Sequence, residues 1–149
     1  MMLSWFILMI AVLTGLIMPT QAGINASLGK ELNSTLHAAF VSFVGGFLAI
    51  TIACLVTREY FPSVKQLLGV PPHLLAGGLL GCVFVVVSIM IAPKLGATLY
   101  VSSVVAGQLI GSILLDHFGW LGFEVHPISW MRLVGVSFLF AGVFLIRLF

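Results

Sequence analysis

The stretch from Leu32 to Thr57 reads LNSTLHAAFVSFVGGFLAITIACLVT and contains no Asp, Glu, Lys or Arg. A bilayer core about 30 Å thick is crossed by roughly 20 apolar residues in a helix. The stretch is long enough for one such crossing. It therefore predicts a membrane-spanning helix.

The same absence of charge extends outward in both directions. Only ten of the 149 residues are charged at neutral pH, six Lys or Arg and four Asp or Glu, and they separate five long apolar stretches. The last stretch is long enough if it starts near Pro127 and if Arg132 and Arg147 extend their charged ends to the membrane surface. We predict an all-α integral membrane protein, a single domain over residues 1–149 with five transmembrane helices at about residues 3–28, 35–56, 73–92, 97–115 and 128–147.

Local signals refine these helices. Pro19 should kink the first helix, and Asn33 or Ser34 is suited to cap the second. Residues 58–70 read as the longest polar link, and the third helix should end before Pro93. Trp120 and Trp130 are candidate anchors at the membrane surface.

The composition excludes several classes of protein. The chain is 61% hydrophobic and 7% charged, whereas about 25% of the residues in a soluble domain are charged. A net charge of +2, dispersed along the chain, does not indicate nucleic-acid binding. Cys54 and Cys82 lie inside apolar stretches, which is typical of thiols acting as small hydrophobic side chains.

The first apolar segment resembles a secretory leader in part. No Lys or Arg precedes Leu3–Met18, however, and the segment continues through Gly23 to Ala26 without a break. We therefore expect it to be retained as the first membrane helix.

The Lys and Arg residues give almost no signal for orientation. Five crossings would place three on the N-terminal side and three on the other: Arg58, Lys65 and Arg132 against Lys30, Lys94 and Arg147. A small bias would be enough to fix one orientation, but the balance favours insertion both ways. Many transporters combine two halves of inverted topology around a site near the midplane. A five-helix chain without an internal repeat lacks the second half, so we expect an antiparallel homodimer with ten helices.

A few polar residues lie inside the predicted crossings. Gln21 and Asn25, four apart, share one face of the first helix, and Gln108 lies near the middle of the fourth. Polar residues at such depth usually face the bundle interior or a cavity. We predict a substrate-binding set made of Gln21, Asn25, His37, Tyr100, Ser103 and Gln108, with His37 near the mouth. The structural alternatives are that the polar groups hydrogen-bond one another and so join the helices, and that His37 is only exposed to water near the membrane boundary.

Small residues recur at four-residue spacing and predict a tight bundle. Ser103, Gly107 and Gly111 form one such ridge, and Gly77 and Gly81 form another. A further pair, Gly135 and Gly142, could form a self-association seam on the last helix.

The sequence carries no sign of catalysis. We find no Ser/His/Asp order, metal-ligand spacing or phosphate loop, and we expect no enzyme activity, metal or cofactor. No Asp or Glu lies well inside a crossing, which disfavours simple exchange of organic cations for protons. Asp116 and Arg132 flank the fourth-to-fifth connection, and we expect them to form a structural pair.

Four runs together resemble the short YdcZ-type members of the drug/metabolite transporter superfamily. They are PTQAGINASL (19–28), AFVSFVG (39–45), GGLLG (77–81) and GQLIGSILLDHFG (107–119), the last with Arg132 downstream. The resemblance covers nearly the whole chain. It implies a five-helix inner-membrane protein, regarded as an exporter and as a half-sized relative of ten-helix transporters. The more distant small multidrug resistance proteins carry a first-helix glutamate, where this chain offers only Gln21 and Asn25.

These observations predict a secondary transporter that exports a small polar or amphipathic molecule by alternating access. Its partners would be the substrate, the lipid bilayer and a second copy of the chain. The alternative is a non-transporting membrane subunit that packs against a larger partner. Glycine ridges fit both functions, whereas a polar path past Gln108 fits only the first.

Overall fold

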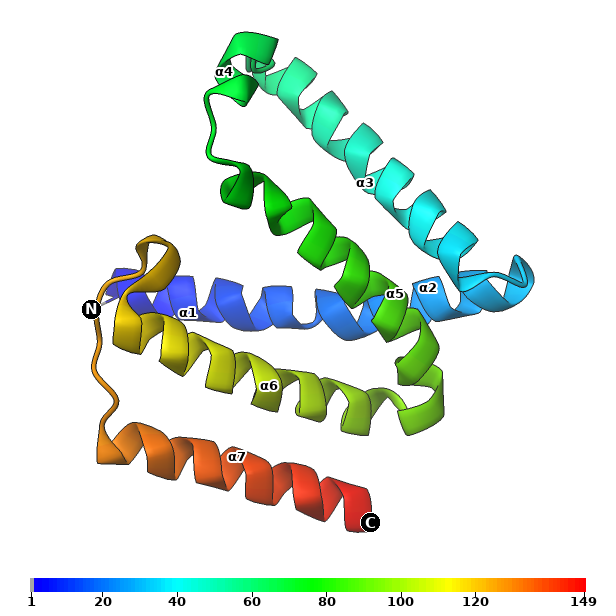
Figure 1. Cartoon of the computed structure of the whole chain (residues 1–149). Helices are drawn as coiled ribbons and strands as arrows, with labels where there is room; N and C mark the ends of the chain where they lie inside the picture. Colours follow the sequence, from blue (N-terminus) through cyan, green and yellow to red (C-terminus); the bar gives the residue numbers. More distant parts are fainter. Residues whose placement is uncertain (1) are drawn as a thin grey trace. The chain divides into compact units, whose positions relative to one another are not determined.

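The structure, a computed structural model, describes residues 2–149, and these residues contain helices but no strand (Figure 1). They form two compact units, divided after Lys94. The helices up to this division are α1 (Met2–Gly15), α2 (Ile17–Glu31), α3 (Thr35–Thr57), α4 (Val64–Leu68), η1 (Pro72–Ala76) and α5 (Gly77–Leu95). Those that follow are α6 (Ala97–Phe118), η2 (Trp120–Gly122) and α7 (Trp130–Leu148). The predicted domain also includes Met1, which lies outside the described residues.

Five helical segments within residues 2–149 are long and apolar enough to cross a membrane. They are Trp5–Glu31, Thr35–Thr57, Pro72–Leu95, Ala97–Phe118 and Trp130–Leu148. Large apolar side chains along them are exposed, as lipid contact requires; Phe47 is one example. The prediction of an all-helical chain with five candidate crossings is confirmed.

The first crossing consists of two helices, α1 and α2, which meet at Leu16. The expected kink therefore lies one turn before Pro19. A proline has no N–H to donate to the carbonyl four residues earlier, which here belongs to Gly15. The chain turns at that point, and the Leu16 N–H bonds instead to the Leu13 carbonyl at 3.1 Å.

The turn from α2 to α3 is closed by its own backbone. Asn33 has a positive φ of 51°, and the N–H groups of Asn33 and Ser34 donate to the carbonyls of Lys30 and Gly29. Asn33, in the left-handed backbone conformation, ends α2 and makes the connection to α3 a tight turn. The Ser34 side chain then accepts a hydrogen bond from the His37 N–H at 3.2 Å, so Ser34 is the cap that the sequence predicted as one of two choices.

Small residues bring α2, α3 and α5 together within the first unit. The buried core contains Ala38 and Ala39 from α3 and Val85 and Ile89 from α5, with Leu28 of α2 packed against it. On α2 the residue facing this core is Gly29. A Cβ there would lie 3.1 Å from Ile89 Cγ2 and 3.7 Å from the Ala38 Cβ. Three backbones can approach closely at this point because α2 presents no side chain.

Two further segments of the first unit differ from the predicted pattern. The polar link after α3 contains the short helix α4, which begins with a capping box between Ser63 and Gln66. Helix α5 continues past Pro93 to Leu95, because a proline in the last turn removes only one backbone hydrogen bond. Gly96, with φ of 78°, then ends the helix.

The second unit is a pair of helices, α6 packed against α7. Helix α6 runs to Phe118 and ends at Gly119, whose φ is 63°. Helix α7 begins at Trp130, two residues later than the sequence suggests. The Ser129 side chain caps α7 by accepting a hydrogen bond from the Arg132 N–H at 3.3 Å.

Replacing Gly29 by Leu should destabilise the first unit. The new side chain must displace Ile89, and overpacking of this kind costs about 1–3 kcal/mol of unfolding free energy. Gly45→Leu on α3 is the matched control, since no heavy atom lies within 4 Å of a Cβ there. Denaturation of the purified protein in detergent measures both. Equal stability of the two variants would contradict the packing described, and Ile89→Ala should partly rescue Gly29→Leu.

Candidate functional site

Helix α2 presents one face with two amides and several small residues to α5. Gln21 and Asn25 are one turn apart, and Ala22 and Ala26 beside them are buried. This spacing follows from the helical repeat, which brings residues three and four apart onto one face. Because alanines flank the amides, α5 can pack close to α2.

The two helices surround a small recess at this face. It has a volume of about 10 Å³, close to the least that can hold one water molecule. It is partly open. Its lining is formed by Met18, Gln21, Ala22 and Asn25 from α2 and by Phe84, Val85 and Ser88 from α5.

Asn25 is the most unusual residue of the recess. It is only 5% exposed, and across residues 2–149 neither its amide nor that of Gln21 has a hydrogen-bond partner. A buried amide without a partner costs on the order of 1–3 kcal/mol. Among the described residues, no unpaired polar side-chain atom is sealed off completely, so the Asn25 amide keeps a little accessible surface. The first unit therefore does not use these amides to tie its helices together.

Ser88 lies opposite on α5 and is 4% exposed. Its hydroxyl donates to the Phe84 carbonyl at 2.6 Å, one turn back along the same helix. Ser88 is not among the residues predicted for the site. Its signal in the sequence is simple, since Ser88 is the one hydroxyl side chain between Gly77 and Lys94.

The other predicted site residues are not among the residues that line the recess. His37 is in the first turn of α3, with its side chain exposed and away from the recess lining. Tyr100, Ser103 and Gln108 lie on α6 in the second unit. Tyr100 is buried, and the Ser103 hydroxyl donates to the Leu99 carbonyl at 2.7 Å. The recess beside Asn25 is therefore built by the first unit alone.

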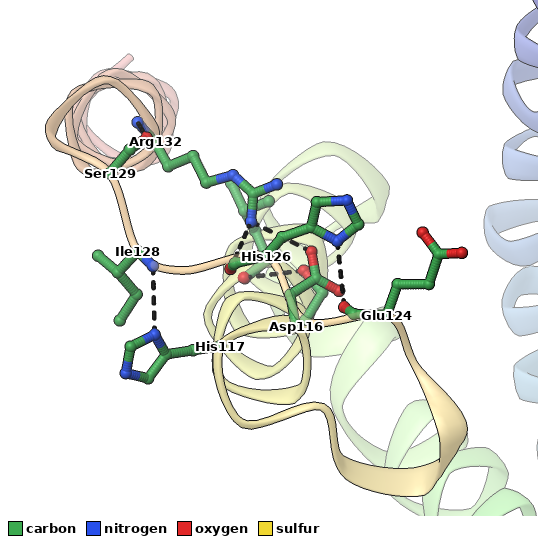
Figure 2. Close-up of polar contacts among 9 residues, drawn as sticks. Asp116, His117, Glu124, His126, Ile128, Ser129 and Arg132 are labelled. Atoms are coloured by element: carbon green, nitrogen blue, oxygen red, sulfur yellow. Dashed lines mark hydrogen bonds and ion pairs between the residues drawn. The ribbon is translucent and has the colours of Figure 1, made fainter.

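The ion pair expected in the second unit is present. Figure 2 shows Arg132 extending from α7 toward Asp116 at the end of α6, with Nη1 and Oδ2 3.2 Å apart. The same Nη1 donates to the His126 carbonyl at 3.3 Å, and the His126 N–H donates to the Asp116 carbonyl at 2.8 Å. The prediction that Asp116 and Arg132 form a structural pair is confirmed.

His117, at the end of α6, and His126, in the connection to α7, both belong to this framework. The Ile128 N–H donates to His117 Nδ1 at 3.2 Å, and His126 Nδ1 lies 3.1 Å from the Glu124 carbonyl (Figure 2). Within residues 2–149, no three His, Cys, Asp or Glu side chains gather as a group that could hold a metal ion. The polar groups of the connection hold the ends of α6 and α7.

Five candidate crossings, with a buried amide at a recess between two of the helices, are typical of a polytopic membrane protein. Comparison with known families makes the assignment specific. Residues 6–145 match the family described as "Putative inner membrane exporter, YdcZ", so the chain belongs to this family and is an inner-membrane protein. No curated protein and no solved structure matches the chain.

Proposed function

We propose that the chain is one half of a secondary exporter for a small polar or amphipathic molecule. Two copies in opposite orientations would form the transporter and would work by alternating access. The observation that carries this proposal is the Asn25 amide, buried beside Ser88 and without a hydrogen-bond partner among residues 2–149. Membership of an exporter family supports the same function.

A buried amide without a hydrogen-bond partner carries a free-energy cost, which a partner gained during the working cycle would remove. If Asn25 served only to join helices, it would bond to a neighbouring helix, and within the described residues it does not. A water molecule or a substrate that donates and accepts hydrogen bonds would satisfy it. In this conformation the recess is no larger than one water molecule, so a substrate would enter only after α2 and α5 separate.

The substrate class follows from the groups at the recess. Gln21, Asn25 and Ser88 offer amide and hydroxyl groups and no formal charge. A small molecule with hydroxyl, amide or zwitterionic groups would pair with them more readily than a simple organic cation would. The place of Tyr100, Ser103 and Gln108 in the substrate path, and of His37 at its mouth, stays a prediction.

The antiparallel homodimer rests on the balance of charges and on open glycine positions. Gly107 and Gly111 on α6, and Gly135 and Gly142 on α7, have no atom within 4 Å of the point that a Cβ would occupy. Helix α7 contains no buried residue. A second copy could approach these helices closely because no bulky side chain intervenes.

Asn25→Leu should reduce substrate flux about tenfold or more. The change removes the amide at nearly constant volume, and each loss of about 1.4 kcal/mol in binding corresponds to a factor of ten. The measurement is efflux of radiolabelled amino acids, polyols and small amides from liposomes that contain only this protein. Thr51→Val on α3 is the control, since its hydroxyl bonds only to the Phe47 carbonyl of its own helix.

The flux assay also separates the two functions. A wild-type protein that moves none of these compounds, but copurifies with one fixed membrane partner, would support the non-transporting subunit instead. Equal flux by Asn25→Leu and Thr51→Val would contradict a substrate role for Asn25. Gln108→Leu tests the second unit in the same assay, with reduced flux and retained folding as the expected result.

The orientation of the chain should be easy to change. Three Lys or Arg residues on each side leave a near tie, which a few added charges would break. Lysines added after Phe149 should place the C-terminus in the cytoplasm, and lysines added within residues 58–70 should give the opposite orientation. Reporter fusions at the C-terminus measure both. A single fixed orientation of the unmodified chain would contradict dual insertion.

A further inference from the structure

A second hollow follows the Asn25 recess along the same two helices. It is an open groove of about 310 Å³, lined by residues that include Ala26, Gly29 and Lys30 of α2, Thr35 of α3, and Pro93 and Lys94 of α5. All of them belong to the first unit. This volume lies at the lower end of the range of small-molecule pockets, about 300–1,000 Å³. We call it the lysine groove.

Two cations from distant parts of the sequence meet at this groove. Lys30 ends the first crossing and Lys94 ends the third, so both lie at the same end of the helices. Neither lysine has a salt-bridge partner among residues 2–149. Glu31 follows Lys30 directly in the sequence, but it is not part of the lining. The groove therefore carries two uncompensated positive charges and no carboxylate.

The helix dipoles compensate only part of this positive charge. Each lysine is in the last turn of its helix, where a cation offsets the partial negative charge of about half a unit. The two lysines together carry two full positive charges, whereas the two helix ends carry two partial negative charges of about half a unit each. Helix α3 adds a positive end at the same place, because it begins at Thr35, a lining residue whose hydroxyl can also donate a hydrogen bond. The positive charge that is left uncompensated at the groove favours the binding of an anion.

We propose that the lysine groove binds an anionic group of the phosphate or carboxylate class. Lys30 and Lys94 would each donate charge-assisted hydrogen bonds to its oxygens, and Thr35 would add a third donor. Such a group could be the headgroup of an anionic phospholipid, because the groove is open and lies at the end of two membrane crossings. It could equally be a soluble anion that enters from the water.

Binding to full-length protein in nanodiscs tests the proposal and separates these sources. For the lipid, native mass spectrometry counts phosphatidylglycerol molecules retained from discs that also contain phosphatidylcholine. For a soluble anion, ³²P-labelled orthophosphate is titrated against protein in discs of phosphatidylcholine alone. We expect at least one of the two probes to bind. Orthophosphate binding would assign the groove to soluble anions, and retention of phosphatidylglycerol alone would assign it to headgroups.

Lys30→Gln and Lys94→Gln should each weaken this binding about fivefold, the effect expected for one Lys at a membrane surface. Arg58→Gln combined with Lys65→Gln is the matched control, since it removes two charges from residues outside the lining. Lys30→Arg with Lys94→Arg should retain binding. The proposal would be overturned if neither probe bound, or if the Arg58→Gln/Lys65→Gln control lost as much binding as a variant that combines Lys30→Gln with Lys94→Gln. These experiments measure binding and not transport. Their outcome therefore tests the anion site independently of the proposed transport function.

Discussion

The close packing of α2 against α5 is the contact on which the arrangement of the first unit depends. Gly29 brings the α2 backbone up to Ile89, and Ala22 and Ala26 keep the helices close along the same face. This packing has a consequence one turn away. It encloses Asn25 and Ser88, so two polar side chains are buried within a helix contact that is otherwise largely apolar. A lipid-facing position would leave the same amide to the bilayer, where no partner exists.

Two hollows of different chemistry lie in succession along this contact. The recess at Asn25 is small and neutral, with amide and hydroxyl groups. The lysine groove is larger, open and positive. Asn25 and Lys30 are five residues apart on one helix, a rise of about 7.5 Å. A molecule with an anionic end and a polar body could contact both, which links the two proposals without making either depend on the other.

The sequence was sufficient to predict the crossings because charged residues are so rare. Lys30 and Glu31, Arg58, and Lys94 mark where crossings end, and the structure ends helices at or beside these residues. The cap at Ser34 and the ion pair between Asp116 and Arg132 were also predictable, since both depend on neighbouring or flanking residues.

Contacts between helices were harder to predict. Small residues signal close packing, but they do not say which helices pack together. The sequence therefore does not distinguish Gly29 from Gly45, although of these two only Gly29 has atoms of other segments within 4 Å of the point that a Cβ would occupy. The same α2–α5 packing places Ser88 at the recess and brings Lys30 and Lys94 to the lining of one groove. The break at Leu16 was displaced from Pro19 because a proline affects the carbonyl one turn earlier.

The claim that Asn25 lies on a water-accessible substrate path can be tested by thiol labelling. Asn25→Cys is made in a chain with Cys54→Ala and Cys82→Ala, reconstituted in sealed vesicles and exposed to a small charged methanethiosulfonate. The control is Phe47→Cys, whose position is 69% exposed on α3 and would face lipid. The account predicts that the thiol at position 25 is labelled, with reagent on either side, while the thiol at position 47 is not. The account would be contradicted if position 25 were labelled from one side only or from neither side.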